Sequence, residues 1–477
     1  MRNELKLAVT CVGKEVRDLN VAFLIVMGIY LAAMMVVGIL DVRRAGSFEE
    51  YAVAGKRQGT LTVCMTLLAT MLGASTTIGI TDTVYDIGFP GIWWLLFGAV
   101  GLLLQAVFLS ERVRAIGADT LPHLAGITVG KAASVLLAVL ISISWIGVVA
   151  GQLVAMHSLV TFATGSSSKV LMVILSVVVI LYTTLGGQLS VVKTDKLQLI
   201  LILLGVILCF AYLYGSTDGA LSDAASRVEL LNESYGVGNL FTQFFVIGGV
   251  FFLGPDIMSR NFLSKDGKTA KRGAWVAGTV LIVFAFLITM IGIWAKLNLS
   301  PEELAGQKTL MVVAGILPKW IGIILSLGLL SAILSSTDTC IINAATIFTR
   351  DILGKKNVTW IRGAVLVIGG LATVIAVCGS GNIINILTGA YSIYTPGVIF
   401  PMLIAILVYK KREVRKGIWL TAVALGGCFG LAATFLSDWL GSIGVPEGVV
   451  SHLSLIGMGV SLVIALSSVR WKKPERE

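Results

Sequence analysis

Charged residues are scarce in this sequence. Only 13% of its 477 residues are Asp, Glu, Lys or Arg, whereas 56% are hydrophobic, and the mean hydropathy is +0.93. Soluble domains carry about twice this share of charge. The composition therefore excludes a soluble globular protein of this length and predicts an integral membrane protein.

Histidine and cysteine are also rare, with three and six copies. No two cysteines have C-x-x-C spacing and most lie in apolar runs, so we expect neither a disulfide framework nor a thiolate metal site. The H-E-x-x-H and G-x-S-x-G signatures are absent. An intramembrane protease or lipid-linked transferase would need such a signature or paired carboxylates in its loops, so an enzyme is not expected.

Long apolar runs are what the sequence does contain. At about 20 residues per span, they predict an all-α integral membrane fold of about thirteen transmembrane helices. The first run, Asn20 to Leu40, is too long for a signal-peptide core, and we expect it to be retained as a helix. The expected helices begin near Asn20, Leu61, Gly91, Ala132, Val170, Leu197, Leu240, Gly273, Ile321, Ile361, Ile383, Gly417 and Leu453.

The basic residues indicate how the chain crosses the membrane. With the N-terminus outside, 27 of the 36 Lys and Arg residues fall on the cytoplasmic side, as the positive-inside rule requires. We therefore expect a multi-pass protein of the cell (plasma or inner) membrane with an external N-terminus and a cytoplasmic C-terminus. No basic face interleaved with aromatic residues accompanies the net charge of +10, so nucleic acid is not an expected partner.

Two of the expected spans contain residues that weaken helices. The span from Leu61 to Val84 contains Gly73, and the span from Leu240 contains Gly254 and Pro255. The two lie five helices apart. Glycine in a span often serves helix packing, but interrupted helices at matching positions of two five-helix halves indicate a binding site at the midplane of a transporter.

A polar face interrupts the apolar run from Ile321 to Phe348. Ala332, Ser335, Ser336 and Thr339 recur at helical spacing and share one face, and Asp338 lies beside them. A carboxylate at mid-bilayer costs roughly 2.5 to 3.5 kcal/mol. Small hydroxyl residues can simply permit close helix packing, but with a neighbouring carboxylate they suit a hard cation such as sodium.

Four longer stretches carry a family resemblance. They are "SFEEYAVAGKRQG" (47–59), "YTTLGGQLSVVKTDKLQ" (182–198), "GPDIMSR" (254–260) and "SAILSSTDTCIINAATIFTRDI" (331–352). Together they resemble the sodium/solute symporter family, which holds proline, pantothenate, sialic acid, sugar and choline carriers. The resemblance runs from about Ser47 to Ile352, and the last helices match only in hydropathy.

The resemblance implies a five-plus-five inverted-repeat core with one helix before it and two after. The whole chain, 1–477, would be one membrane transport domain. Its repeats would cover about 60–214 and 240–408, and its extra helices about 20–40, 417–436 and 453–468. The principal sodium would be held by the carbonyls of Ala69, Leu72 and Ala332 and by the hydroxyls of Ser335 and Ser336.

A second ion position is also implied by the resemblance. Asp195 is similar to an aspartate that in some members helps bind a second sodium, and the matching positions on the serine helix are Asp338 and Thr339. Two carboxylates in a low dielectric need a cation or a shared proton between them, so sodium and a proton both remain candidates. Alternatively, Asp195 faces cytoplasmic water beside Lys193 and Lys196.

Candidate solute contacts follow the breaks or lie on the fourth and seventh spans. Asp82 matches an acidic residue of the choline-like branch, which suggests a cationic solute. Tyr391 and Tyr394 are candidates for an outer gate. The solute candidates are Thr76, Thr77, Asp82, Trp145, Gln152, Phe251 and Phe252.

These features together predict a sodium-coupled secondary active symporter. It would import a small organic solute by alternating access, with Na+ as the coupling ion and the lipid bilayer as its surroundings. The alternative is a proton-coupled symporter of the same fold that uses Asp195 and Asp338.

Overall fold

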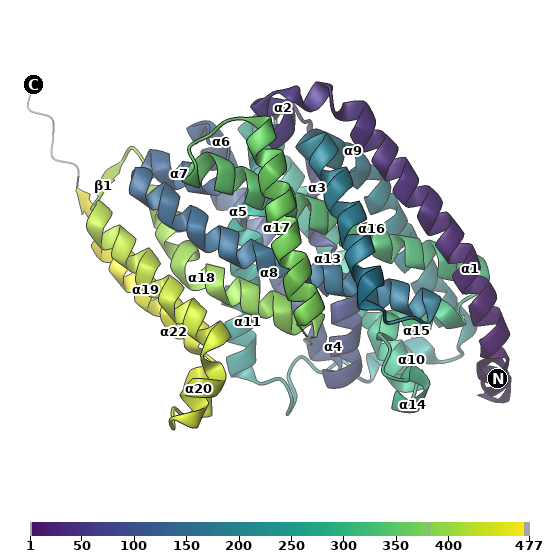
Figure 1. Ribbon diagram of the computed structural model, residues 1–477. Helices are drawn as coiled ribbons and strands as arrows, with labels where there is room; N and C mark the ends of the chain where they lie inside the picture. Colours follow the sequence, from purple (N-terminus) through teal and green to yellow (C-terminus); the bar gives the residue numbers. More distant parts are fainter. Residues whose placement is uncertain (1, 380–381, 472–477) are drawn as a thin grey trace, which may run out of the picture.

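The computed structural model describes residues 2–379 and 382–471, and in this part the chain is a bundle of long helices (Figure 1). The first helix, α1 (Arg2–Asp41), lies along one flank of the bundle, and the last helices lie along the other. The start of α1 and the strand β1 (Arg412–Val414) lie at opposite ends of the bundle (Figure 1).

The core contains two runs of helices. The first run comprises α3 (Thr60–Met71), α4 (Ile80–Ile87), α5 (Trp93–Phe108), α6 (Ser110–Ile116), α7 (Leu121–Thr128), α8 (Lys131–Thr164) and α9 (Lys169–Ser216). The second comprises α11 (Val237–Leu253), α12 (Pro255–Leu263), α13 (Gly267–Asn298), α15 (Thr309–Ile316), α16 (Lys319–Ile347), α17 (Val358–Cys378) and α18 (Ile383–Val408).

Shorter elements complete the bundle. After the core come α19 (Lys416–Phe435), α20 (Ser437–Ser442), α21 (Glu447–Val450) and α22 (Leu453–Ser467). The connections hold α2 (Phe48–Val53), α10 (Ala220–Ala225) and α14 (Pro301–Leu304). An unexpected antiparallel ribbon of β1 (Arg412–Val414) and β2 (Val469–Trp471) joins the last helices at the end where the chain finishes.

Within the described residues, ten helices are long and apolar enough to cross a membrane. The pair formed by α3 and α4, bent by 61° at its break, adds an eleventh span. Reaching thirteen requires α9 to be counted as two spans and the 15-residue α22 as one. The prediction of an all-α membrane fold is confirmed.

One departure from the expected boundaries lies in α9. The sequence predicted that a span begins near Leu197, whereas α9 turns at Gly187 and continues as helix from there. Gly187 has φ 59° and ψ −160°, and a β-carbon at this residue would lie 2.6 Å from the Tyr51 ring. A glycine in this conformation turns the chain without a loop, so Lys193 is helical and pairs with Asp41 at 2.5 Å.

The core is centred on α16. In the most apolar 18-residue stretch of this helix, 78% is buried inside the bundle, compared with 28% in the corresponding stretch of α1 and 33% in that of α19. Every residue of α16 from Leu325 to Ile347 is buried. The polar face of this helix therefore points into protein and not into lipid.

Candidate transport site

The first break separates α3 from α4. Leu72 leaves the helical region with φ −85° and ψ 60°, and a π-helical turn, η3 (Ser75–Gly79), precedes α4. A β-carbon at Gly73 would lie only 2.4 Å from the Ser336 hydroxyl oxygen. Glycine is needed here because the broken turn lies directly against α16.

The second break separates α11 from α12. Gly254 is extended, with φ −60° and ψ 144°, and Pro255 begins α12. Proline lacks an amide hydrogen and cannot continue the preceding helix, but it suits the first turn of the next one. Tyr394 of α18 donates its hydroxyl to the Leu253 carbonyl at 2.6 Å, so a carbonyl left by the break gains a partner.

The serine pair of α16 contacts the first break directly. Ser335 donates to the Ala69 carbonyl at 2.7 Å and to the Ala332 carbonyl at 3.1 Å. Ser336 donates to the Thr70 carbonyl at 2.8 Å. Two hydroxyls and three carbonyls from two helices therefore converge in a buried place, and this set of hard oxygen ligands suits a sodium ion.

The predicted sodium ligands map onto this cluster with one difference. The structure brings Ala69, Ala332, Ser335 and Ser336 together, and it adds the Thr70 carbonyl, which sequence reasoning missed. Leu72 lies at the non-helical end of α3. The contact of Ser336 with the Thr70 carbonyl depends on the rotation of one helix against the other, for which the sequence carries no signal.

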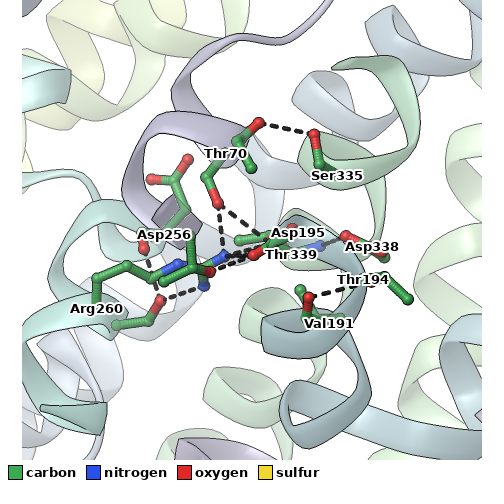
Figure 2. Close-up of polar contacts among 12 residues, drawn as sticks. Thr70, Val191, Thr194, Asp195, Asp256, Arg260, Ser335, Asp338 and Thr339 are labelled. Atoms are coloured by element: carbon green, nitrogen blue, oxygen red, sulfur yellow. Dashed lines mark hydrogen bonds and ion pairs between the residues drawn. The ribbon is translucent and has the colours of Figure 1, made fainter. Parts of the chain in front are cut away.

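The predicted second ion position contains an arginine. The Arg260 guanidinium lies 3.2 Å from the Asp195 carboxylate and 2.7 Å from the Thr339 hydroxyl, and both charged side chains are fully buried (Figure 2). Thr66 donates its hydroxyl to the same Asp195 oxygen. Asp195 therefore faces the interior of the bundle, not cytoplasmic water.

Asp338 lies on the other side of Thr339 from Arg260 (Figure 2). It accepts a hydrogen bond from the Tyr182 hydroxyl at 2.6 Å and another from the Thr339 amide at 2.7 Å. Among the described residues it forms no ion pair. Sequence reasoning missed Arg260 and Tyr182 as parts of this cluster, although each stands in a stretch that carries the resemblance.

A small polar cavity of about 20 Å³ lies between the two breaks. It is bounded by residues of α3, α8, α11, α12, α16 and α18. Its lining residues are Thr70, Met71, Gly73, Ser75, Val148, Gln152, Val250, Phe251, Asp256, Ile257, Ser336, Cys340 and Tyr391.

Asp256 is the only carboxylate in this lining. One of its oxygens accepts the Ile257 amide at 3.0 Å, and the other has the Cys340 thiol at 3.9 Å. Within the described part of the chain it forms no ion pair, whereas Asp195 and Asp119 each do. A buried carboxylate without an ion pair is stabilised by taking up a proton or by a cation from outside the protein.

The predicted solute residues divide into several groups. Gln152 and Phe251 line the cavity, and Gln152 also accepts the free Ala74 amide of the broken turn at 3.1 Å. Trp145 is buried behind the cavity with its ring 5.2 Å from that of Tyr394. Thr76 and Thr77 do not belong to the lining, because both donate to the Gly73 carbonyl of their own broken turn.

Two of the predicted solute contacts lie elsewhere. Asp82 is on α4 toward the far end of the bundle, where it pairs with Lys308 at 3.0 Å and accepts the Thr309 amide at 2.8 Å. Phe252 lines an apolar groove between α5, α11 and α18. Residues next to each other on a helix point in different directions, which separates Phe252 from Phe251.

Aromatic rings separate the cavity from a wider vestibule. The vestibule, of about 550 Å³, lies where α4 and α18 begin, and Trp94 is in its lining. The Trp94 ring lies 6.4 Å from that of Tyr391, which lines the cavity. Tyr391 therefore stands between the two spaces, and Tyr394 lies behind it against Trp145.

An ion-pair network closes the opposite end of the bundle. Asp119, before α7, pairs with Lys56 at 2.7 Å and with Arg350 at 2.8 Å. Arg350, in the π-helical turn η5 (Phe348–Ile352) after α16, also pairs with Asp351 at 2.9 Å. Thr120 donates to Asp351 at 2.6 Å, so these contacts join both core runs.

The electrostatics of this network involve one histidine. Burial, followed by the charge of Arg350, lowers the pKa of His123 to about 4. Burial alone would raise the pKa of Asp119, but the Lys56 hydrogen bond and the Arg350 charge outweigh it, and the pKa is lowered. The network therefore holds a neutral imidazole beside an ionised carboxylate at neutral pH.

Comparison with known proteins decides the family. The profile described as "Sodium:solute symporter family" matches residues 51–424, which is most of the chain. The chain belongs to the sodium:solute symporter family. The resemblance seen in the sequence is confirmed, and this multi-pass membrane protein is a transporter and not an enzyme.

Family relatives named for different solutes match over most of the chain. The high-affinity choline transporter 1 of Drosophila melanogaster is 25% identical, covering 95% of this chain and 79% of the relative. The sodium/pantothenate symporter of Escherichia coli is 24% identical, with 86% and 90% covered. The osmoregulated proline transporter OpuE of Bacillus subtilis is 23% identical, with 84% and 86% covered.

Solved structures share the fold. A Na+-coupled sialic acid symporter in a substrate-bound outward-open state has a TM-score of 0.73 at 18% identity, covering 95% of this chain and 99% of that chain. A nucleobase-cation-symport-1 family transporter has a TM-score of 0.59 at 14% identity, covering 89% and 94%. The predicted symporter fold is thereby confirmed.

Proposed function

We propose that this family member is a sodium-coupled symporter that imports a small organic cation by alternating access. The observation that carries the sodium part is the pair of α16 hydroxyls on the carbonyls of the broken α3. The ligands would be the oxygens of Ala69, Thr70, Ala332, Ser335 and Ser336, with Leu72 at the edge of the shell. Sodium is cargo at this site because it enters with the solute and leaves into the cell.

The solute class follows from Asp256 and its aromatic neighbours. A carboxylate without a protein cation lines the same cavity as Phe251 and Tyr391, with Trp145 behind them. Aromatic faces and a nearby carboxylate favour ammonium groups. The name of the choline transporter relative agrees with this class. The proline relative is named for a zwitterion and the pantothenate relative for an anion.

The two ends of the bundle support alternating access. The wide vestibule would face the outside and the ion-pair network around Asp119 the cytoplasm, which matches the external N-terminus proposed from the basic residues. Repeats covering about 60–214 and 240–408 would rock about the two breaks. Tyr391 and Tyr394 would form the outer gate, and the network would form the inner one.

The coupling energy is adequate for uptake. A tenfold sodium gradient and 100 mV supply about 1.4 and 2.3 kcal/mol per ion, so one ion can concentrate a neutral solute a few hundredfold. A cationic solute gains about another 2.3 kcal/mol per 100 mV from its own charge.

Sodium is favoured over the proton alternative by two observations. The pantothenate relative and the sialic acid symporter are named for sodium. In addition, Asp195 already has the Arg260 guanidinium as a partner, so it does not need a shared proton with Asp338.

The test uses purified protein in liposomes. A panel of quaternary and primary amines, amino acids, carboxylates and sugars would be screened by thermal shift with and without sodium, and stabilising compounds would then be assayed for uptake. We expect accumulation of an amine driven by an inward sodium gradient. Accumulation of an uncharged or anionic solute would refute the cation assignment, and uptake driven by a pH gradient without sodium would refute sodium coupling.

A further inference from the structure

Arg260 is the feature of the site that sodium symport does not require. It belongs to α12, the helix half after the second break, and its side chain is fully buried in the middle of the bundle. Burying a guanidinium is costly unless acids and hydroxyls surround it. Its position therefore needs a reason other than packing.

The contacts of Arg260 are those of a bound cation. Its Nη2 atom lies 2.5 Å from the Thr70 hydroxyl, 2.7 Å from the Thr339 hydroxyl and 3.2 Å from Asp195. These oxygens come from α3, α16 and α9, and the second ion position was predicted between the last two of these helices (Figure 2). A charged nitrogen bonded to three oxygens here fills the place of a small monovalent cation.

The Arg260 position is next to the principal sodium cluster. Thr70 contributes its hydroxyl to Arg260 and its carbonyl to Ser336. The two positions therefore share a residue of the first break. A change in charge at one of them will be felt at the other, because two cations in a low dielectric repel each other strongly.

The charge balance of the cluster supports the same reading. The guanidinium and the Asp195 carboxylate form a buried ion pair of zero net charge, so no further cation is needed to neutralise Asp195. Without the arginine, Asp195 would require a monovalent cation from outside the protein.

We propose that Arg260 is a built-in second cation, so that one sodium ion and not two accompanies each solute molecule. The inference rests on the proposed sodium-coupled symport. A tethered guanidinium neutralises Asp195 throughout the cycle but never leaves the protein. It therefore supplies the charge of a second ion without adding a second ion's gradient to the driving force.

The decisive measurement is the coupling stoichiometry of the unmodified protein. The liposomes would be held at zero membrane potential. At several sodium gradients, the experiment would measure the ratio of internal to external solute concentration at which net solute flux stops. One ion per solute changes this ratio about tenfold for each tenfold change in the sodium gradient, whereas two ions change it about a hundredfold. A hundredfold change would overturn the inference but leave symport intact, and no change would overturn symport itself.

Two substitutions test whether the arginine is responsible. Arg260→Met keeps much of the side-chain length without its charge, and Arg260→Lys keeps the charge. We expect the methionine variant to bind a second sodium, with a Hill coefficient rising from about 1 toward 2 and a steeper flux-reversal slope, while the lysine variant stays at 1. A folded methionine variant with the original slope would overturn the inference.

A double substitution serves as the control for misfolding of the single variant. Arg260→Met combined with Asp195→Asn removes both charges and restores the net charge of the cluster. We expect this variant to keep a stoichiometry of one. A stoichiometry of two in the double variant would contradict the charge argument, and the measurement on the unmodified protein decides the inference even if neither variant folds.

Discussion

The hydroxyl of Ser336 donates to the carbonyl of Thr70 over 2.8 Å, although 266 positions separate the two residues. The neighbouring pair, Ser335 and Ala69, repeats the contact with the same separation in sequence. Two consecutive hydroxyls thus meet two consecutive carbonyls at a helix end where the helical hydrogen-bond ladder is broken. The sodium site proposed for this transporter depends on this pairing of two serine hydroxyls with two backbone carbonyls.

Replacing Ser336 by alanine should weaken sodium binding. The variant loses one oxygen contact to the ion, and hydrogen-bond partners of charged groups are worth about 1.5 to 3 kcal/mol. We expect the sodium concentration for half-maximal uptake to rise about 10- to 100-fold, as measured by uptake into liposomes at varied sodium. Thr337→Val is the matched control, because the Thr337 hydroxyl donates to the Ile333 carbonyl of its own helix. Equal sodium affinity in the two variants would refute the assignment.

Gly73→Ala should damage the first break. The added β-carbon would lie 2.4 Å from the Ser336 hydroxyl oxygen and 3.0 Å from its β-carbon. Forcing extra volume into a packed interior costs about 1 to 3 kcal/mol. We expect a lower melting temperature and a loss of uptake. Gly370→Ala is the control, because a β-carbon there meets nothing within 4 Å, and a variant at Gly73 as active as this control would contradict the packing described here.

Asp256→Asn should weaken recognition of a cationic solute. The substitution keeps the shape of the side chain but removes the charge that the cavity offers to an ammonium group. We expect the KM for an amine to rise at least tenfold, the equivalent of about 1.4 kcal/mol, while sodium affinity changes little. Asp82→Asn is the comparison, since Asp82 is paired with Lys308 outside the cavity. A larger effect at Asp82 than at Asp256 would favour the residue chosen from the sequence.

Acid pH should loosen the inner ion-pair network. The pKa of His123 is lowered to about 4 from an ordinary value of 6.5, so protons bind preferentially when the network is open. The network is therefore most stable above pH 6.5 and loses stability as the pH falls from 6.5 toward 4. The charged groups facing this histidine are Asp119, Arg350, Lys356 and Lys56.

Hydrogen exchange of the peptides that cover α7 would measure this loosening, with rates corrected for the intrinsic effect of pH. We expect protection to fall between pH 6.5 and 5 in the unmodified protein. His123→Gln should flatten this dependence because glutamine does not titrate. Unchanged protection across the range, or the same pH dependence in the variant, would be inconsistent with a histidine held neutral by the network.

Much of the architecture was predictable because it depends on local properties of the chain. Hydrophobic runs report membrane spans, and Gly73, Gly254 and Pro255 report breaks through backbone geometry alone. The spacing of Ser335 and Ser336 on one helix likewise marks a polar face wherever that helix lies. These features need no knowledge of the partner helices.

The partners in the site depended on tertiary packing. Arg260 reaches Asp195 across 65 positions and Thr70 across 190, and no local pattern encodes either contact. Asp82 and Asp256 are both acidic residues after a break, yet one faces Lys308 at the end of the bundle and the other lines the cavity. Helix rotation and crossing decide such differences, because a side chain's neighbours are set by the helix opposite and not by its own sequence.

The sequence by itself therefore determined the membrane class, the helical fold, the two breaks and the polar face of α16. The tertiary structure alone decided which carbonyl each serine meets, which carboxylate forms an ion pair with an arginine and which lines the cavity. The physical reason is that burial and hydrophobicity are properties of single segments, whereas charge neutralisation inside a membrane is a property of groups that several segments bring together.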